Sequence, residues 1–126
     1  MEISHLDHFV LTTAHLEKCL HFYTDILGME LRHENGRYAL FFGKSKINIH
    51  TRPAEFLPAA ENPETGALDL CFAVQTPIEA VMRNLRDKGV VPETGIVPRR
   101  GARGPMQSVY LRDPDGNLIE LCSYAV

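Results

Sequence analysis

The sequence predicts an α+β fold in which one domain, residues 1–126, contains two βαβββ modules. Three observations lead to this prediction. Each half of the chain has the pattern of one strand, one helix and three strands. The helix of each half ends at a glycine, Gly28 or Gly89. A proline-containing loop, residues 52–66, separates the halves. We therefore expect module 1 at about residues 1–52 and module 2 at about 67–126, forming curved mixed sheets around a cleft.

The first module is predicted to begin with a strand at residues 3–12, whose side chains alternate between two faces. A helix is predicted at residues 14–27, because apolar side chains recur there every three or four residues. Asn35 and Gly36 are a hairpin signal between two of the following strands. Those three strands are expected at residues 29–34, 37–42 and 46–51.

The second module repeats this order. A strand is predicted at residues 68–74 and a helix at 77–88, with Pro77 in its first turn. The sequence DPDGN at residues 113–117 has the composition of a tight turn. Around it, the last three strands are expected at about 91–97, at 106–112 and at 118–123.

The composition narrows the classes of function. A net charge of −3 argues against a nucleic-acid partner, and no apolar run is long enough to span a membrane. The first residues lack the pattern of a signal peptide. The three cysteines lie far apart without a CxxC motif, which is typical of reduced thiols. We therefore expect a cytoplasmic protein.

Polar residues also repeat between the modules. The offset of 61 residues that maps Gly28 onto Gly89 also maps His8 onto Asp69. An offset of 70 residues relates His50 to Glu120, and the nine-residue difference between the two offsets falls where the second half carries an extra loop, at residues 99–105. Any α/β chain can be cut into two similar halves, but matched helix ends and matched polar strand positions favour a true repeat.

Four predicted strands each carry one residue that can bind a metal: His8, His50, Asp69 and Glu120. Two imidazoles and two carboxylates suit a divalent ion such as zinc, nickel, manganese or iron(II). Two histidines and one carboxylate leave coordination positions open for substrate, as catalysis requires. Taken singly, each histidine is more typical of a half-buried structural residue, and Asp69 of a cap or an ion-pair partner.

Several motifs resemble the vicinal oxygen chelate superfamily, which includes glyoxalase I, fosfomycin- and bleomycin-resistance proteins and extradiol dioxygenases. They are LDHFV at residues 6–10, FY at 22–23, LGM at 27–29 and DPDGN at 113–117 before Glu120. The sequences SKINIH at 45–50 and PRRGARGP at 98–105 are most similar to a small glyoxalase-domain branch that includes bacterial virulence-associated proteins. The resemblance covers essentially the whole chain.

The resemblance implies residues for the site. The family's ligands on the first, fourth and eighth strands fall on His8, His50 and Glu120. The ligand on the fifth strand, usually histidine, falls on Asp69, which can either bind metal or serve as a base. In relatives the site often lies between modules of different chains, which implies a homodimer.

The implied activity is that of a lactoylglutathione lyase-type enzyme acting on a small 2-oxoaldehyde–thiol adduct, with glutathione as a candidate co-substrate. The metal would act as a Lewis acid, and Asp69 or Glu120 would transfer the proton. The same fold leaves three alternatives open: a fosfomycin-type thiol transferase, an extradiol dioxygenase, and a bleomycin-resistance-like protein that sequesters a ligand without catalysis.

The remaining candidate residues concern the substrate. Arg99, Arg100 and Arg103 lie in the predicted extra loop, which would be a lid that grips an anionic substrate, or simply a solvated charged loop. Asn48 shares a strand face with His50 and is a further substrate-binding candidate.

Overall fold

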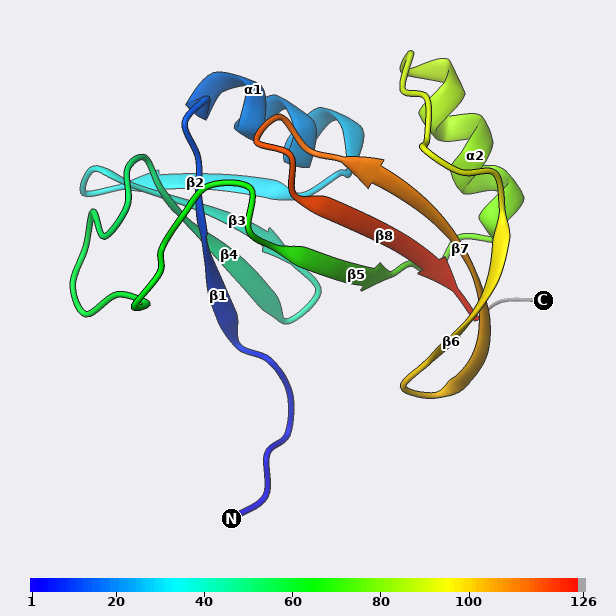
Figure 1. Ribbon diagram of the computed structural model, residues 1–126, viewed down its shortest axis with the longest axis horizontal. Helices are drawn as coiled ribbons and strands as arrows, with labels where there is room; N and C mark the ends of the chain where they lie inside the picture. The colour runs from blue at the N-terminus through cyan, green and yellow to red at the C-terminus, as the bar shows by residue number, and fades with distance from the viewer. Residues whose placement is uncertain (125–126) are drawn as a thin grey trace. The chain divides into compact units, whose positions relative to one another are not determined.

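Two four-stranded mixed sheets carry the fold, as the sequence predicts (Figure 1). The computed structural model describes residues 1–124, and the chain divides into two units, Met1–Ala67 and Leu68–Val126. Each unit holds one helical segment and one sheet. Within residues 1–124, no helix is long and apolar enough to cross a membrane.

In the first unit, the strands lie in the order β1-β4-β3-β2, with β1 parallel to β4 and the other pairs antiparallel. Asn35 and Gly36, both with positive φ, form the predicted turn between β2 and β3. The elements are β1 (His8–Thr12), α1 (Leu16–His21), η1 (Phe22–Ile26), β2 (Glu30–Glu34), β3 (Arg37–Phe42) and β4 (Ser45–His50).

The predicted helix at residues 14–27 is present, but its second half, η1, is a π-helix. In this wider turn the Leu27 amide donates to the Phe22 carbonyl at 3.1 Å, and the Thr24 hydroxyl donates to the Leu20 carbonyl at 2.7 Å. A threonine bond to the carbonyl four residues earlier bends a helix. The wider turn accompanies the burial of two consecutive aromatic residues, Phe22 and Tyr23.

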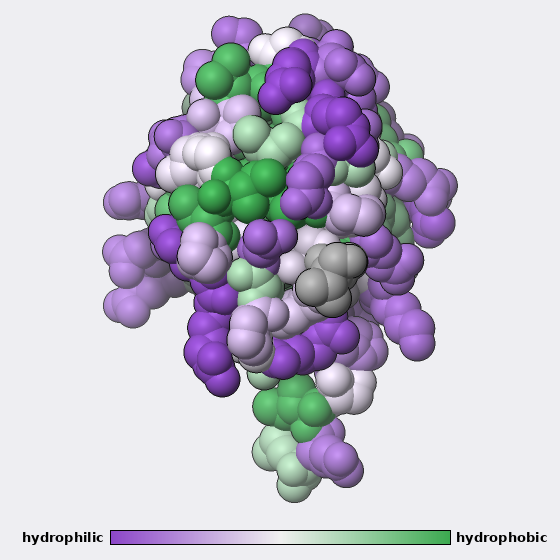
Figure 2. Space-filling view, turned by 90° about the vertical axis from the view of Figure 1, so that its right-hand side faces the viewer, coloured by the Kyte–Doolittle hydropathy of each residue, from purple (hydrophilic) through white to green (hydrophobic). Residues whose placement is uncertain are grey.

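The first strand begins at His8, five residues later than predicted. Its partner β4 begins at Ser45. The hydrogen bonds nearest the N-terminus are donated by Lys46 N to Asp7 O and by Ser45 Oγ to Leu6 O. Among residues 1–124, no strand pairs with the residues before Leu6. Figure 2 shows this N-terminal extension protruding at the bottom with hydrophobic atoms exposed, in agreement with the large exposed fractions of Met1 and Ile3.

In the second unit, the strand order β5-β8-β7-β6 matches that of the first, with β5 parallel to β8. The predicted extra loop at residues 99–105 is wrong, because these residues form the hairpin between β6 and β7, with Arg99 opposite Met106. Pro98 is tolerated in β6 because β6 is an edge strand. The elements are β5 (Asp69–Ala73), α2 (Ile78–Asp87), β6 (Val97–Gly101), β7 (Gly104–Arg112) and β8 (Leu118–Ser123).

One face of each sheet belongs to the buried core. Each aliphatic side chain that is buried on this face contributes about 1.5–3 kcal/mol to stability. Because strand residues alternate, the residues between them point to the opposite face, where all the candidate site residues of β1, β4, β5 and β8 lie. The buried strand residues are Leu11, Leu40, Ile47 and Ile49 in the first unit and Val109, Leu111, Ile119 and Leu121 in the second.

The predicted turn at residues 113–117 is held by two buried side chains, Asp113 and Asn117. Asp113 Oδ1 accepts the backbone amides of Asp115 at 3.0 Å and Asn117 at 2.9 Å, and Oδ2 accepts Asn117 Nδ2 at 2.7 Å. Asn117 Oδ1 in turn accepts the Leu68 amide at 2.9 Å. The turn therefore fixes where β8 begins beside β5.

Candidate functional site

The first sheet carries a cavity of 330 Å³, lined entirely by residues of the first unit. Lys46, Asn48 and His50 line it from alternate positions of β4. Ala39 also lines it, and is paired with Asn48 on one side and with Arg32 on the other. A methyl group among long side chains leaves a depression, so the sequence of β3 explains why the sheet is hollow there.

Three cations line this cavity, two of them stacked on aromatic rings. Arg32 Cζ lies 3.9 Å from the centre of the Phe41 ring, and Arg37 Cζ lies 4.0 Å from that of Phe56. Lys46 Nζ is 5.8 Å from the Phe41 ring. Stacking occupies the flat face of a guanidinium and leaves its N–H edges available for an anion.

His50 is the buried polar residue of the cavity, with 7% of its surface exposed. Its Nδ1 atom is buried without a hydrogen-bond partner among the described residues. The Phe56 ring packs edge-on against the imidazole, with ring centres 5.3 Å apart. Burial lowers the pKa of His50, Glu55 opposes this effect and Arg37 adds to it, so the imidazole is neutral at neutral pH.

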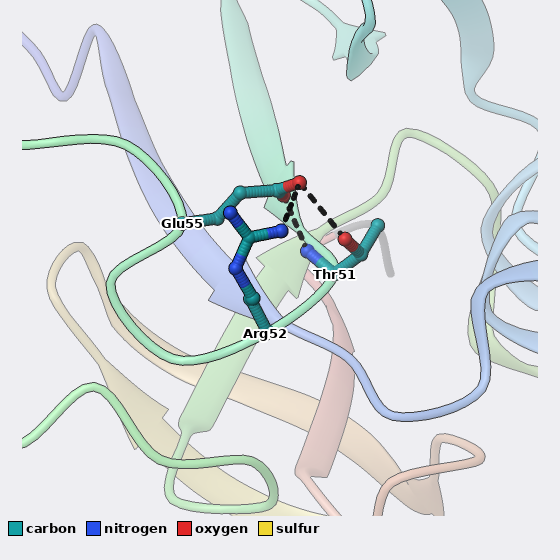
Figure 3. A network of polar contacts seen from close by, with 3 residues as sticks. All are labelled: Thr51, Arg52 and Glu55. Atoms are coloured by element: carbon teal, nitrogen blue, oxygen red, sulfur yellow. Dashed lines mark hydrogen bonds and ion pairs between the residues drawn. The ribbon is translucent and has the colours of Figure 1, made fainter.

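The loop after β4 is folded back by Glu55 (Figure 3). The Glu55 carboxylate accepts the Thr51 backbone amide at 2.7 Å and the Thr51 hydroxyl at 2.9 Å, and Arg52 Nη1 lies 3.5 Å away. The Thr51 backbone bond is the main reason that the pKa of Glu55 is lowered. By closing this short loop, Glu55 holds the next residue, Phe56, at the cavity wall.

The second sheet presents a cluster around Glu120. The buried Ser108 hydroxyl donates to Glu120 Oε2 at 2.6 Å, and Cys71 is paired with Glu120 across the parallel strands. Desolvation, followed by the neighbouring Cys122 and Glu120, raises the pKa of the Cys71 thiol to about 12. The thiol is therefore protonated and a poor nucleophile.

The strand registers show which residues of the two sheets are equivalent. In the first sheet His8 is paired with Lys46, and Asn48 follows two residues further along β4. In the second sheet Asp69 is paired with Leu118, and Glu120 follows two residues further along β8. The equivalent of Glu120 is therefore Asn48. The prediction that His50 is the repeat partner of Glu120 is wrong, because His50 lies two residues further along β4 than Asn48.

The structure keeps the two predicted histidine ligands apart. His8 and His50 belong to one sheet but lie four residues apart in register, about 13 Å along the strands. The exposed His8 instead lies with Nδ1 2.8 Å from the Asp7 carboxylate, an interaction that lowers the pKa of Asp7. Among residues 1–124, no three His, Cys, Asp or Glu side chains form a group that could hold a metal.

The arginines of the predicted lid are tied to the hairpin. Arg99 Nε donates to Tyr110 Oη at 3.0 Å. Arg103 Cζ lies 4.3 Å from the Tyr124 ring, and the Arg103 amide donates to Tyr124 Oη at 3.2 Å. Neither arginine is among the residues that line the cavity of the first sheet.

The lining residues that sequence reasoning missed include the three cations and the loop aromatic residue: Arg32, Arg37, Lys46 and Phe56. The first three share a sheet face with Asn48 and His50, so strand alternation carried a signal for them. Nothing in the sequence indicates that the loop residue Phe56 folds back onto His50.

Comparisons with known proteins agree with this architecture. The family model described as Glyoxalase/Bleomycin resistance protein/Dioxygenase superfamily matches residues 5–121. Virulence protein STM3117 of Salmonella typhimurium is 42% identical over 98% of this chain and 87% of its own length. Glyoxalase domain-containing protein RDO1 of Mycosarcoma maydis is also 42% identical, over 98% of this chain and 70% of its own.

A solved structure gives the same result. An integron cassette protein from the mobile metagenome of V. cholerae is 47% identical, with a TM-score of 0.94 over 99% of this chain and 98% of that chain. The family match spans nearly the whole sequence, and the relatives exceed 40% identity. The chain therefore belongs to the glyoxalase/bleomycin resistance protein/dioxygenase superfamily.

Proposed function

We propose that the protein is a divalent-metal-dependent, glyoxalase-like lyase that acts on a small 2-oxoaldehyde–thiol adduct. The observation that supports this proposal is the matched register of the two sheets. Each sheet presents two polar residues at the same places on its open face, His8 with Asn48 and Asp69 with Glu120. Repeated donors at repeated positions are expected of a site inherited with the repeat.

The chemistry of this donor set fits a divalent cation. An imidazole nitrogen and two carboxylates are ligands for zinc, nickel, manganese or iron(II). We assign ligand roles to His8, Asp69 and Glu120 and none to His50. Because no three such side chains form a group within residues 1–124 of one chain, we propose that two chains of a homodimer supply them. A metal held by these residues would supply Lewis-acid chemistry to the substrate.

The chain's own carboxylates would move the proton. Asp69 is exposed on the open sheet face and is available as the base that transfers a proton between adjacent carbons. Ser108 restrains Glu120 through its hydrogen bond, which favours a ligand role for that carboxylate over movement during the reaction. Asn48, at the position equivalent to Glu120, supplies a neutral amide for the substrate.

The test is a metal-resolved activity screen with the adduct of methylglyoxal and glutathione. We expect activity with at least one divalent ion in excess, and we expect that activity to be lost when a chelator is added. Glu120→Ala and His8→Ala should lower metal content, whereas Asp69→Asn should lower activity more than metal content. Asp87→Ala, which removes an exposed carboxylate at the end of α2, is the matched control. Wild-type protein that binds no divalent metal would refute the proposal.

A second candidate reaction is extradiol ring cleavage. Biphenyl-2,3-diol 1,2-dioxygenase 3 of Rhodococcus globerulus is 30% identical over 92% of this chain and 61% of its own length. Oxygen uptake with catechols by protein loaded anaerobically with iron(II), together with inactivity toward the hemithioacetal, would favour this reaction.

Assembly and location complete the proposal. We expect a homodimer, which sedimentation velocity would test. We also expect a cytoplasmic protein, because the described cysteines form no disulfide. Fractionation of cells that produce the native chain would test that expectation.

A further inference from the structure

The cavity of the first sheet has a polar composition that calls for a ligand of its own. Its lining contains three cations and a single carboxylate, Glu34. Arg32 is partly neutralised by Glu30 at 3.5 Å. Among residues 1–124, neither Arg37 nor Lys46 has a carboxylate within ion-pair distance, which is 4.0 Å. Two unpaired cations that line one cavity favour an anionic occupant.

The second observation comes from His50. Its side chain is more than nine-tenths buried, lines the same cavity and carries an unpartnered Nδ1 atom. A buried polar atom without a partner costs free energy, so such an atom at a cavity indicates a bond that is completed by a ligand. The Phe56 ring packs edge-on against the imidazole and lines the same cavity.

The strand registers place these groups along one groove. Lys46, Asn48 and His50 follow one another on β4, and Phe41, Ala39 and Arg37 run beside them on β3. Lys46 and His50 are about 13 Å apart along the strand, so the groove suits a small molecule. Arg37 approaches His50, because it influences the pKa of that imidazole and both side chains contact Phe56.

We propose that this cavity binds a small organic oxyanion, with Arg37 contacting the anionic group, Lys46 adding positive charge at the other end of the groove, and His50 hydrogen-bonding to a neutral oxygen of the same molecule. Glu55 is a positioning residue for this site, because it holds the loop that carries Phe56. The site lies wholly within the first unit and needs none of the proposed metal chemistry. A carboxylate and a phosphate share the required chemistry.

The experiment is an NMR titration of the full chain in the presence of a chelator, with backbone amides of β3 and β4 as reporters. Pyruvate supplies a carboxylate with a neighbouring carbonyl, pyruvamide is its neutral counterpart, and inorganic phosphate tests the other oxyanion. We expect saturable shifts with pyruvate or phosphate and none with pyruvamide. Because the chelator removes metal, this result is independent of whether the proposed lyase activity exists.

Variants separate the site from general ion binding. Arg37→Gln should weaken binding about tenfold, the expected effect of losing one charge-assisted contact. Lys44→Gln removes a charge from the exposed turn between β3 and β4 and should leave binding unchanged. Ala39→Leu should abolish binding by filling the depression, and Arg37→Gln remains informative if that variant does not fold.

The results of the titrations and of the variants would either support or overturn the proposed oxyanion site. Tighter binding of phosphate than of pyruvate, with the same dependence on Arg37, would support the site and identify phosphate as the preferred group. Equal weakening by Arg37→Gln and Lys44→Gln, or equal binding of pyruvate and pyruvamide, would overturn the proposal.

Discussion

Replacing Asp113 with alanine should destabilise the protein strongly. Asp113 is 4% exposed and Asn117 is 1% exposed, so two donors of Asn117, the backbone amide at 2.9 Å and Nδ2 at 2.7 Å, would lose their acceptor in the interior. Hydrogen bonds to a charged group contribute about 1.5–3 kcal/mol each. Since the Asp115 amide lies at the more exposed end of the turn, its bond adds little. We expect a loss of about 4 kcal/mol.

The assay is urea denaturation followed by far-UV circular dichroism, because the chain has no tryptophan. With an m-value of about 2 kcal/mol/M, the transition midpoint should fall by about 2 M. Asp113→Asn keeps both bonds to Oδ1 but sets one amide nitrogen against another, so it should cost about 2 kcal/mol. Glu61→Ala, in an exposed loop, is the control. An Asp113→Ala midpoint within about 0.5 M of wild type would refute this account of the turn.

Two further predictions concern the loop after β4 and the β6–β7 hairpin. The folded-state pKa of Glu55 is lowered from its ordinary value of 4.5, so its contribution to stability is present above that value and is lost as pH falls through the folded pKa. The difference in melting temperature between wild type and Glu55→Gln should therefore narrow below about pH 4.5, whereas a constant difference would contradict the role of the charge. Gly101→Ala should displace the Tyr124 hydroxyl and Met106 Sδ, which lies 2.6 Å from the position of the new Cβ, at a cost of about 1 kcal/mol. Unchanged NMR shifts of the Tyr124 ring would contradict that contact.

The fold could be predicted because local signals agree with one another. Gly28 and Gly89 end their helical segments with φ of 79° and 73°, and Asn35 and Gly36 form a turn of their own. Residues 98–105 misled the prediction because arginine, glycine and proline are typical of loops. They form a hairpin because β7 offers them backbone partners. This pairing is local, from Gly101 with Gly104 out to Val97 with Ser108, but a composition typical of loops does not reveal it.

The site was harder to predict than the fold. Alternation placed Asn48 and His50 on one face, but alternation cannot say which neighbour lies opposite. An error of two residues in register preserves the face and changes the residue, which is how His50 instead of Asn48 was predicted to be the equivalent of Glu120. Phe56 reaches the cavity only through the bonds of Glu55, a local contact in an irregular loop.

The bond from the Leu68 amide to Asn117 has a consequence for how the second unit assembles. It joins residues 49 apart in sequence, and closing a flexible chain of that length costs about 3.5 kcal/mol of entropy. The Asp113 turn can form early, since its bonds span at most four residues. The side-chain oxygen of Asn117 gains its partner only after the folding chain has brought Leu68 beside the turn. A fragment that lacks Leu68 would therefore keep the turn but lose this bond between the start of β5 and the start of β8. Because the bond and the pairing of β5 with β8 depend on each other, we expect the second unit to fold in one cooperative step.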